Sequence, residues 1–272
     1  MNTFSDQNTE RIKSIAQKTR YKHKAMEWGV PPSYFIKKEG LDYAEYNLNS
    51  NGFLARVTKT IKNIVKVIKA AIIIPERVIL IDTTLHPAKK PFGQSHEFGH
   101  NDIPEHREIL YVCSEQDLNP QTRDEMEFEA NVYASELLLP SPLMEAIYKE
   151  YPIAMETILQ LKNLSGASIH SAAIKYVTNC REECCLLILE VDNDEDGNSG
   201  LRLKRQIPSI GWWKRYKKLL QDFQFFPPKH NLSLVVFSGN AEDIEKNTVK
   251  VDKQEFQVHT FYNSYIVLAL LF

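Results

Sequence analysis

The sequence predicts an α+β fold: a mainly helical core that contains a small sheet, joined to a mixed α/β C-terminal unit. Apolar residues recur at the helical period from about residue 90 to residue 180, whereas β-branched runs gather before and after that segment. Helices and strands in separate runs are typical of α+β proteins rather than of a doubly wound parallel sheet. With 272 residues, 43% of them hydrophobic, the chain can bury one large core or two modest ones.

A helix is expected over residues 7–28, and glycine and proline residues at 29–32 end it. Its charged residues are expected to form a solvated face. Alternating and β-branched residues at 52–57 and 64–82 then indicate strands of the small sheet. Because this sheet precedes the most informative helix of the chain, its edge is a candidate for pairing with an extended peptide.

Five helices are predicted in the middle of the chain, separated by proline, glycine or polar residues. They cover residues 91–103, 120–139, 141–151, 153–162 and 168–177. The polar segment between the first two is predicted to be an irregular loop. The last two have a helix-turn-helix look, but the final helix offers few side chains that read bases, so a packing role is favoured.

The predicted domain boundary lies at residue 180, with residues 1–180 in the first domain and residues 181–272 in a mixed α+β second domain. Strands of the second domain are predicted over residues 186–191, 201–206, 232–237, 256–261 and 265–271. The segment around Trp212 is basic and aromatic. An amphipathic helix with Trp212 packed inward is favoured there over a nucleic-acid site.

The central motif is His-Glu-x-x-His at residues 96–100, inside a predicted helix. Histidines four residues apart share a helical face, so the imidazole nitrogens of His96 and His100 can converge on one zinc ion. Glu97 is placed to take a proton from a water molecule at that metal. This is the chemistry of a metallopeptidase. The pattern also occurs by chance in unrelated helices, so the residues around it must decide.

A third ligand must come from elsewhere, because a catalytic zinc usually takes three side chains and keeps one position for water. The helix over 120–139 offers Glu127, which falls inside its apolar stripe, and Glu129, which lies on its polar flank. A carboxylate aimed into an apolar face needs a cation, so Glu127 is the predicted ligand; an ion pair with Lys or Arg is the alternative. Asn131 can support a ligand by hydrogen bonding, and Tyr133 is a weaker candidate for an oxyanion donor.

His106 offers a competing third ligand. Together with His96 and His100 it has the histidine spacing of the pattern His-Glu-x-x-His-x-x-Gly-x-x-His. The glycine of that pattern permits a sharp turn, and Ile103 stands in its place here. His106 is therefore expected to be a surface histidine in a charged loop, and substitution of His106 or Glu129 is expected to change metal content little.

In combination, these motifs resemble the ImmA/IrrE family of metallopeptidases. The resemblance rests on Ile-Leu-Ile-Asp at 79–82, Phe92 ahead of His-Glu-Phe-Gly-His, and Glu-x-x-Ala-Asn with Ala-x-Glu-Leu-Leu-Leu-Pro at 127–140. It covers roughly the middle third of the chain. It implies a zincin-like catalytic domain in which His96, His100 and Glu127 hold the metal and Glu97 is catalytic.

The resemblance also implies an endopeptidase whose substrate is a protein, typically a helix-turn-helix repressor of stress or mobile-element genes. Zinc is the expected metal, although two imidazoles and a carboxylate also tolerate Mn²⁺ or Fe²⁺. The C-terminal domain is expected to be a sensor-like extension. A rival hypothesis is a regulatory protein- or DNA-binding module that retains the metal only for structure.

Net charge, cysteine content and the length of apolar runs indicate which partners and which compartment to expect. A net charge of −2 gives no global attraction to nucleic acid, so direct nucleic-acid binding is not expected. Four cysteines without a framework spacing suggest reduced thiols in a cytoplasmic protein. The polar N-terminal segment does not resemble a signal peptide, and the longest apolar runs are too short to span a bilayer, so no membrane partner is expected.

Overall fold

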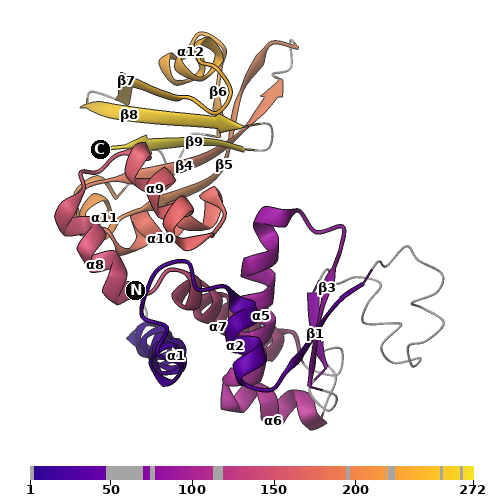
Figure 1. Cartoon of the computed structure of the whole chain (residues 1–272). Helices are drawn as coiled ribbons and strands as arrows, with labels where there is room; N and C mark the ends of the chain where they lie inside the picture. Colours follow the sequence, from indigo (N-terminus) through magenta and orange to yellow (C-terminus); the bar gives the residue numbers. More distant parts are fainter. Residues whose placement is uncertain are drawn as a thin grey trace. The chain divides into compact units, whose positions relative to one another are not determined.

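The computed structural model describes residues 3–46, 70–73, 77–112, 119–193, 197–217, 219, 224–251, 254–263 and 266–272. Their helices and strands fall in separate groups, which confirms the predicted α+β fold (Figure 1). The chain divides into unit 1, with Met1–Leu143 and Asn163–Ser168, and unit 2, with Met144–Lys162 and Ile169–Phe272. The predicted domain boundary at residue 180 stays a prediction.

Unit 1 contains a three-stranded sheet in the order β1-β3-β2. Strand β1 (Asp42–Tyr46) runs parallel to the central strand β3 (Val78–Asp82), and β2 (Ala70–Ile73) runs antiparallel to β3. Strands β2 and β3 fall within the predicted range 64–82, whereas the strand predicted at 52–57 lies outside the described residues. The sequence of β1, Asp-Tyr-Ala-Glu-Tyr, lacks β-branched residues, so sequence patterning missed it.

Helices of unit 1 pack around this sheet and around one another. They are α1 (Thr3–Lys22), α2 (Pro32–Lys38), the short 3₁₀ helix η1 (Pro87–Lys89), α5 (Lys90–Asp102), α6 (Pro104–Val112) and α7 (Pro120–Leu138). Helix α5 contacts β2, β3 and α7, and α1 packs on α7 (Figure 1). The central helix therefore touches both the sheet and the helix that carries the predicted third ligand.

The segment after α5 is a helix, so the loop predicted from residue 104 onwards is wrong over residues 104–112. Helix α5 ends at Asp102, and the backbone of its C-cap residue Ile103 is extended, with φ −77° and ψ 114°. Pro104 then starts α6; proline suits a first helical position because the N–H that it lacks would have no partner there. Glu105 in the first turn is favourable beside the positive end of the helix dipole.

The basic side chains of α1 are not all solvated, in contrast to the expectation for this helix. Arg20 is fully buried, and its guanidinium donates to the backbone carbonyls of Leu137 and Glu27. Nε of Arg20 is buried without a hydrogen-bond partner among the described residues, whereas the two terminal nitrogens are paired, and the bond to Leu137 ties α1 to the C-terminal end of α7.

A close contact joins α5 to α7 at Gly99. A Cβ atom at Gly99 would lie 3.0 Å from Cδ1 and 3.1 Å from Cγ of Tyr133. The Tyr133 ring is itself fully buried and packs edge-on against Phe98, with ring centroids 5.9 Å apart. A residue without a side chain at position 99 therefore lets the two helices approach, and this approach sets the distance between the histidines of α5 and the carboxylates of α7.

Unit 2 is built on a six-stranded antiparallel sheet in the order β6-β5-β4-β9-β8-β7. Its strands are β4 (Cys185–Asn193), β5 (Ser199–Pro208), β6 (Phe225–Phe226), β7 (Ile244–Val251), β8 (Gln254–Asn263) and β9 (Ile266–Leu271). The later helices are α8 (Ser141–Glu150), α9 (Met155–Ser165), α10 (Ile169–Asn179), α11 (Ile210–Tyr216) and α12 (Asn231–Ser238). Helix α10 contacts β4 and β5, and α12 contacts β7 and β8 (Figure 1).

The strand predicted at 232–237 is wrong, because these residues form α12. Leu232, Val235 and Val236 are buried while Leu234 and Phe237 are exposed, which is a helical pattern. The His230 side chain accepts from the backbone N–H of Leu232 at the N-cap. Local β-propensity is thus overridden by the cap and by packing against the sheet. The predicted strands at 186–191, 201–206, 256–261 and 265–271 correspond to β4, β5, β8 and β9.

Helix α11 is amphipathic with Trp212 inward, as predicted. Trp212 is 1% exposed, and its ring lies 4.8 Å from that of Tyr216 and 4.9 Å from that of Phe256 between centroids. Trp213 on the other side is exposed beside Lys217. In α10 even Lys175 is buried, which agrees with the predicted packing role of this helix.

The contact at Gly99 yields a test of the fold. Gly99→Val should destabilise the protein by about 1–3 kcal/mol, because the added methyl groups must displace a buried ring. Urea unfolding of this variant, of Tyr133→Ala and of the double variant measures the coupling between the two positions. In the Tyr133→Ala background the additional cost of Gly99→Val should be small. An equal cost in both backgrounds would show that the ring is not what position 99 meets.

Candidate metal centre

Three side chains converge between α5 and α7. His96 Nε2 and His100 Nε2 lie 3.2 Å apart, His96 Nε2 lies 3.3 Å from Glu127 Oε2, and His100 Nε2 lies 3.4 Å from Glu127 Oε1. The histidines come from successive turns of α5, and Glu127 comes from the second turn of α7. Glu127 thus meets two histidines that lie far from it in the sequence. Among the described residues, these three side chains form a group that could hold a metal ion.

The spacing of the three donors fits a tetrahedral metal. Bonds of about 2.0–2.2 Å to nitrogen and oxygen place neighbouring donors of a tetrahedral zinc site about 3.3–3.6 Å apart. The observed separations of 3.2–3.4 Å match that edge length. Two imidazoles and a carboxylate are also the donor set that leaves the fourth position for water in catalytic sites.

The site shifts the two histidine pKa values in opposite directions and keeps Glu127 ionised. Burial lowers the pKa of His100 to about 4, so this imidazole is neutral at pH 7 and keeps a lone pair. Burial also acts to lower the pKa of His96, but hydrogen bonding to Glu127 and the charge of Glu97 outweigh it and raise that pKa above its ordinary value. Hydrogen bonds from His100 and His96 hold the pKa of Glu127 far below its usual range, so the carboxylate is ionised.

Glu97 and Asn131 flank the histidines. Glu97 is buried, and its charge is felt by His96. Asn131 lies one turn beyond Glu127 on α7, and its Oδ1 is 3.1 Å from Nδ1 of His96. The contact to Asn131 agrees with its predicted supporting role. By holding Nδ1, Asn131 turns Nε2 of His96 towards Glu127.

The expectation that His106 is a surface histidine is wrong. The side chain is buried in α6, with Nδ1 3.2 Å from Nδ1 of His100 and Nε2 2.8 Å from Oε2 of Glu129. It contacts the nitrogen of His100 that points away from Glu127, so it does not join the three converging donors. The spacing alone missed this position, because Pro104 starts a new helix that folds His106 back onto α5.

Tyr133 does not face the three donors in the way an oxyanion donor would require. Its hydroxyl is buried and donates to Oδ2 of Asp102 at 2.6 Å, and Thr19 of α1 donates to the same oxygen. Burial and the Asp102 charge raise the pKa of Tyr133 well above its ordinary value. Tyr133 is therefore interpreted as a structural residue, whose hydrogen bond to Asp102 links α7 to α5 and α1, rather than as an oxyanion donor.

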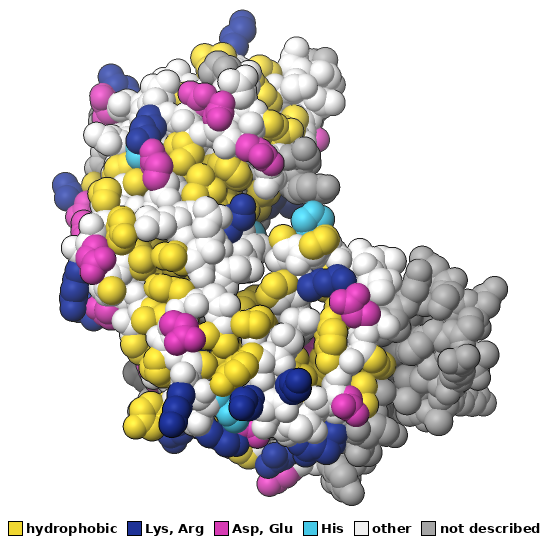
Figure 2. All heavy atoms as spheres, in the orientation of Figure 1, with side chains coloured by type: hydrophobic (Ala, Val, Ile, Leu, Met, Phe, Trp, Pro, Cys, Tyr) yellow, Lys and Arg dark blue, Asp and Glu magenta, His cyan; other side chains and the backbone are white. Residues whose placement is uncertain are grey.

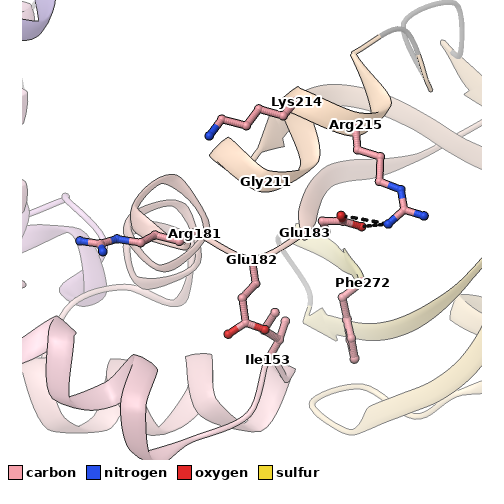
Figure 3. A pocket seen from close by; sticks show the side chains of 8 residues that line it. All are labelled: Ile153, Arg181, Glu182, Glu183, Gly211, Lys214, Arg215 and Phe272. Atoms are coloured by element: carbon pink, nitrogen blue, oxygen red, sulfur yellow. Dashed lines mark hydrogen bonds and ion pairs between the residues drawn. The ribbon is translucent and has the colours of Figure 1, made fainter.

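A separate hollow of about 810 Å³ lies in unit 2 (Figure 3). Its wall includes Arg215, whose guanidinium is 3.1 Å from both carboxylate oxygens of Glu183, and Gly211, where an added Cβ would meet the backbone of Arg181 and Glu182 at 2.7 Å. Lys214 adds a further positive charge to the lining (Figure 3). The hollow carries both charge signs and, unlike the site in unit 1, has no histidine beside a carboxylate in its lining.

The surface of the protein carries charged side chains of both signs. On the face drawn in Figure 2, Lys and Arg side chains lie among Asp and Glu side chains over both units. Within the described part of the chain, none of the helices has the length and apolar character needed to cross a bilayer.

Comparison with known proteins supports the resemblance seen in the motifs. Residues 60–175 match the family model described as the IrrE N-terminal-like domain (Peptidase_M78), a range that is less than half of the chain. No curated protein matches the sequence. A solved structure of a Mycobacterium tuberculosis transcriptional regulator is similar, with a TM-score of 0.55 at 13% identity, over 98% of this chain and 77% of that chain. At this identity the likeness concerns the fold alone.

The Tyr133–Asp102 contact predicts a stability effect. Tyr133→Phe removes the hydroxyl donor from a part-buried carboxylate and should lower the free energy of unfolding by about 1–3 kcal/mol, since hydrogen bonds to charged groups lie in that range. Urea denaturation measures this change. Tyr34→Phe, which removes a hydroxyl from an exposed hydrogen bond, is the matched control. If Tyr133→Phe were as stable as the control, the buried link would not hold the helices together.

Proposed function

We propose that the protein is a metal-dependent endopeptidase that hydrolyses a peptide bond in a protein substrate, because residues 60–175 match the IrrE N-terminal-like domain and the motifs resemble those of the ImmA/IrrE family. The observation that carries this proposal is the convergence of His96, His100 and Glu127, with donor atoms 3.2–3.4 Å apart. These three side chains would hold the metal, and Glu97 would be the catalytic residue.

Zinc suits this donor set best, while Mn²⁺ and Fe²⁺ are compatible with it. A bound divalent metal would supply Lewis-acid polarisation of the scissile carbonyl and would lower the pKa of a water molecule towards neutrality. Two of the three side chains are in the protonation state that metal binding requires, because Glu127 is ionised and His100 is neutral. Asn131 keeps the His96 ring turned towards the same point.

Glu97 is the group that would move protons in this reaction. It follows His96 directly on α5, and its side chain is buried. The carboxylate would take a proton from the attacking water and return it to the leaving amine. Its place in the His-Glu-x-x-His motif, directly after His96, supports this role.

The substrate class follows from the family resemblance, which implies a helix-turn-helix repressor. Among the described strands, β2 lies at one edge of the sheet and contacts α5, so an extended segment pairing with β2 would run beside the metal ligands. Strand addition binds mainly through the peptide backbone, which suits a peptidase that recognises an unfolded linker in its substrate.

The assignment of Glu127 as a metal ligand can be tested by substitution. Glu127→Ala should lose most bound zinc during dialysis against a weak chelator, because only two imidazoles remain. Glu125→Ala is the matched control, since it removes the same charge from an exposed position of the same helix. Metal analysis of both purified variants gives the answer. Retention of zinc by Glu127→Ala would exclude Glu127 as a ligand.

The proposed role of Glu97 in proton transfer can also be tested by substitution. Glu97→Gln keeps the size of the side chain and should retain zinc and the unfolding temperature, while cleavage falls by at least about 100-fold, the lower end of the usual range for general acid–base catalysis. Mass spectrometry of an incubated peptide library, and of repressors encoded beside the gene, measures cleavage. Unchanged regulation of target genes by Glu97→Gln would favour the rival hypothesis of a binding module with a structural metal.

A further inference from the structure

A chain of hydrogen bonds leads away from the candidate metal centre through His106. The Nδ1 atoms of His100 and His106 are 3.2 Å apart, and Nε2 of His106 is 2.8 Å from Oε2 of Glu129. His106 is 1% exposed, so water does not compete for these contacts. The three groups come from α5, α6 and α7 in turn.

The chemistry of imidazole determines which group donates and which accepts in each of these hydrogen bonds. If Nε2 of His100 uses its lone pair for a metal, its Nδ1 carries the hydrogen and must donate it. The acceptor within reach is Nδ1 of His106, which leaves the hydrogen of that ring on Nε2. This hydrogen points at Glu129, an acceptor. One set of tautomers therefore satisfies all the nitrogens at once, and it is the set in which His100 can bind a metal.

Glu129 is itself held in place from α1. Nδ2 of Asn8 donates to Oε1 of Glu129 at 2.6 Å, and a guanidinium nitrogen of Arg11 lies 3.6 Å from Oε2. Arg11 also pairs with Glu105 at 2.9 Å, beside His106 in sequence. A carboxylate with fixed partners on its far side is a stable anchor for a histidine on its near side.

Glu127 and Glu129 share helix α7 but project to different sides of it. Glu127 meets Nε2 of His100, and Glu129 reaches Nδ1 of the same ring through His106. The His100 imidazole is thus held from both nitrogens by one helix. The other histidine, His96, is supported by the neutral amide of the exposed Asn131.

We propose that His106 and Glu129 are positioning residues that fix the orientation and tautomer of His100 as a metal ligand. The relay runs Glu129–His106–His100 and is anchored on α1. This inference rests on the proposed metal site. It replaces the expectation that substitution of His106 or Glu129 changes metal content little. That expectation placed His106 in a surface loop and Glu129 on the polar flank of its helix.

Two variants of His106 separate hydrogen bonding from packing. His106→Phe keeps an aromatic ring in the buried position and removes both hydrogen bonds, whereas the side-chain amide of His106→Gln can still accept from His100 and donate to Glu129. Glu129→Ala removes the anchor itself and serves as an independent variant. Glu125→Ala is the control for loss of a carboxylate from α7, at a position outside the relay.

Three quantities are measured for each full-length variant. The zinc dissociation constant comes from competition with a chromophoric chelator, the ligand field comes from the visible absorption of the cobalt(II)-loaded protein, and the stability of the fold comes from thermal unfolding of the metal-free protein. None of these requires a substrate, so the result does not depend on cleavage.

His106→Phe and Glu129→Ala should each weaken zinc binding about 10- to 100-fold, the usual effect of removing such supporting contacts, and should change the cobalt spectrum. His106→Gln should recover most of the affinity and the native spectrum, and Glu125→Ala should match the unsubstituted protein. Zinc affinity and a cobalt spectrum that are unchanged in both His106→Phe and Glu129→Ala would overturn the relay. So would a loss in His106→Gln equal to that in His106→Phe, since packing alone would then explain the effect.

Glu127→Ala distinguishes failure of the relay from failure of the metal site. If Glu127→Ala loses zinc while His106→Phe and Glu129→Ala retain it, the site stands and the relay is wrong. If Glu127→Ala also binds zinc with the affinity of the unsubstituted protein, the proposed site is wrong, and the relay, which depends on it, falls too. Should His106→Phe not fold, Glu129→Ala and His106→Gln still decide between the outcomes.

Discussion

The close approach of α5 to α7 is the constraint on which the candidate site depends. Gly99 leaves room for the buried ring of Tyr133, and a Cβ there would already lie 3.0 Å from that ring. One residue further along α5 stands His100, and six residues before Tyr133 on α7 stands Glu127, so the helix spacing fixes the ligand spacing. Packed interiors transmit such shifts because they have few voids. The sheet contributes by supporting the other side of α5 through β2 and β3.

Helix α1 is a structural partner of this pair rather than a solvated covering. Arg20 donates to the carbonyl of Leu137, Thr19 donates to Asp102, and Gln17 donates to the buried Glu136 of α7. Near its N-terminal end the same helix holds Glu129. Polar groups buried between helices have to be paired, and paired groups accept one geometry only. The polar side of α1 therefore specifies where α7 lies, and with it the position of Glu127.

Sequence reasoning succeeded where a pattern is local and periodic. The histidines four residues apart follow from the 3.6-residue period, and in the structure they meet Glu127. The apolar stripe of α7 does not account for the choice of Glu127, because the Glu127 side chain is 43% exposed and that of Glu129 only 13%. Sequence reasoning failed where the outcome depends on contacts between distant segments. His106 looked solvated because its neighbours are charged, and its burial depends on α6 folding back after Ile103. Residues 232–237 looked like a strand because valine and phenylalanine favour strands, but packing on the sheet and the His230 cap select a helix.

The central claim is that one metal ion binds between α5 and α7. A crystal structure of the zinc-loaded protein, with anomalous diffraction recorded on both sides of the zinc absorption edge, tests it directly. A single zinc peak is expected within about 2.0–2.2 Å of Nε2 of His96, Nε2 of His100 and a carboxylate oxygen of Glu127. A zinc peak bound by His106, or one without Glu127 as a ligand, would show that the ion does not bind in this way.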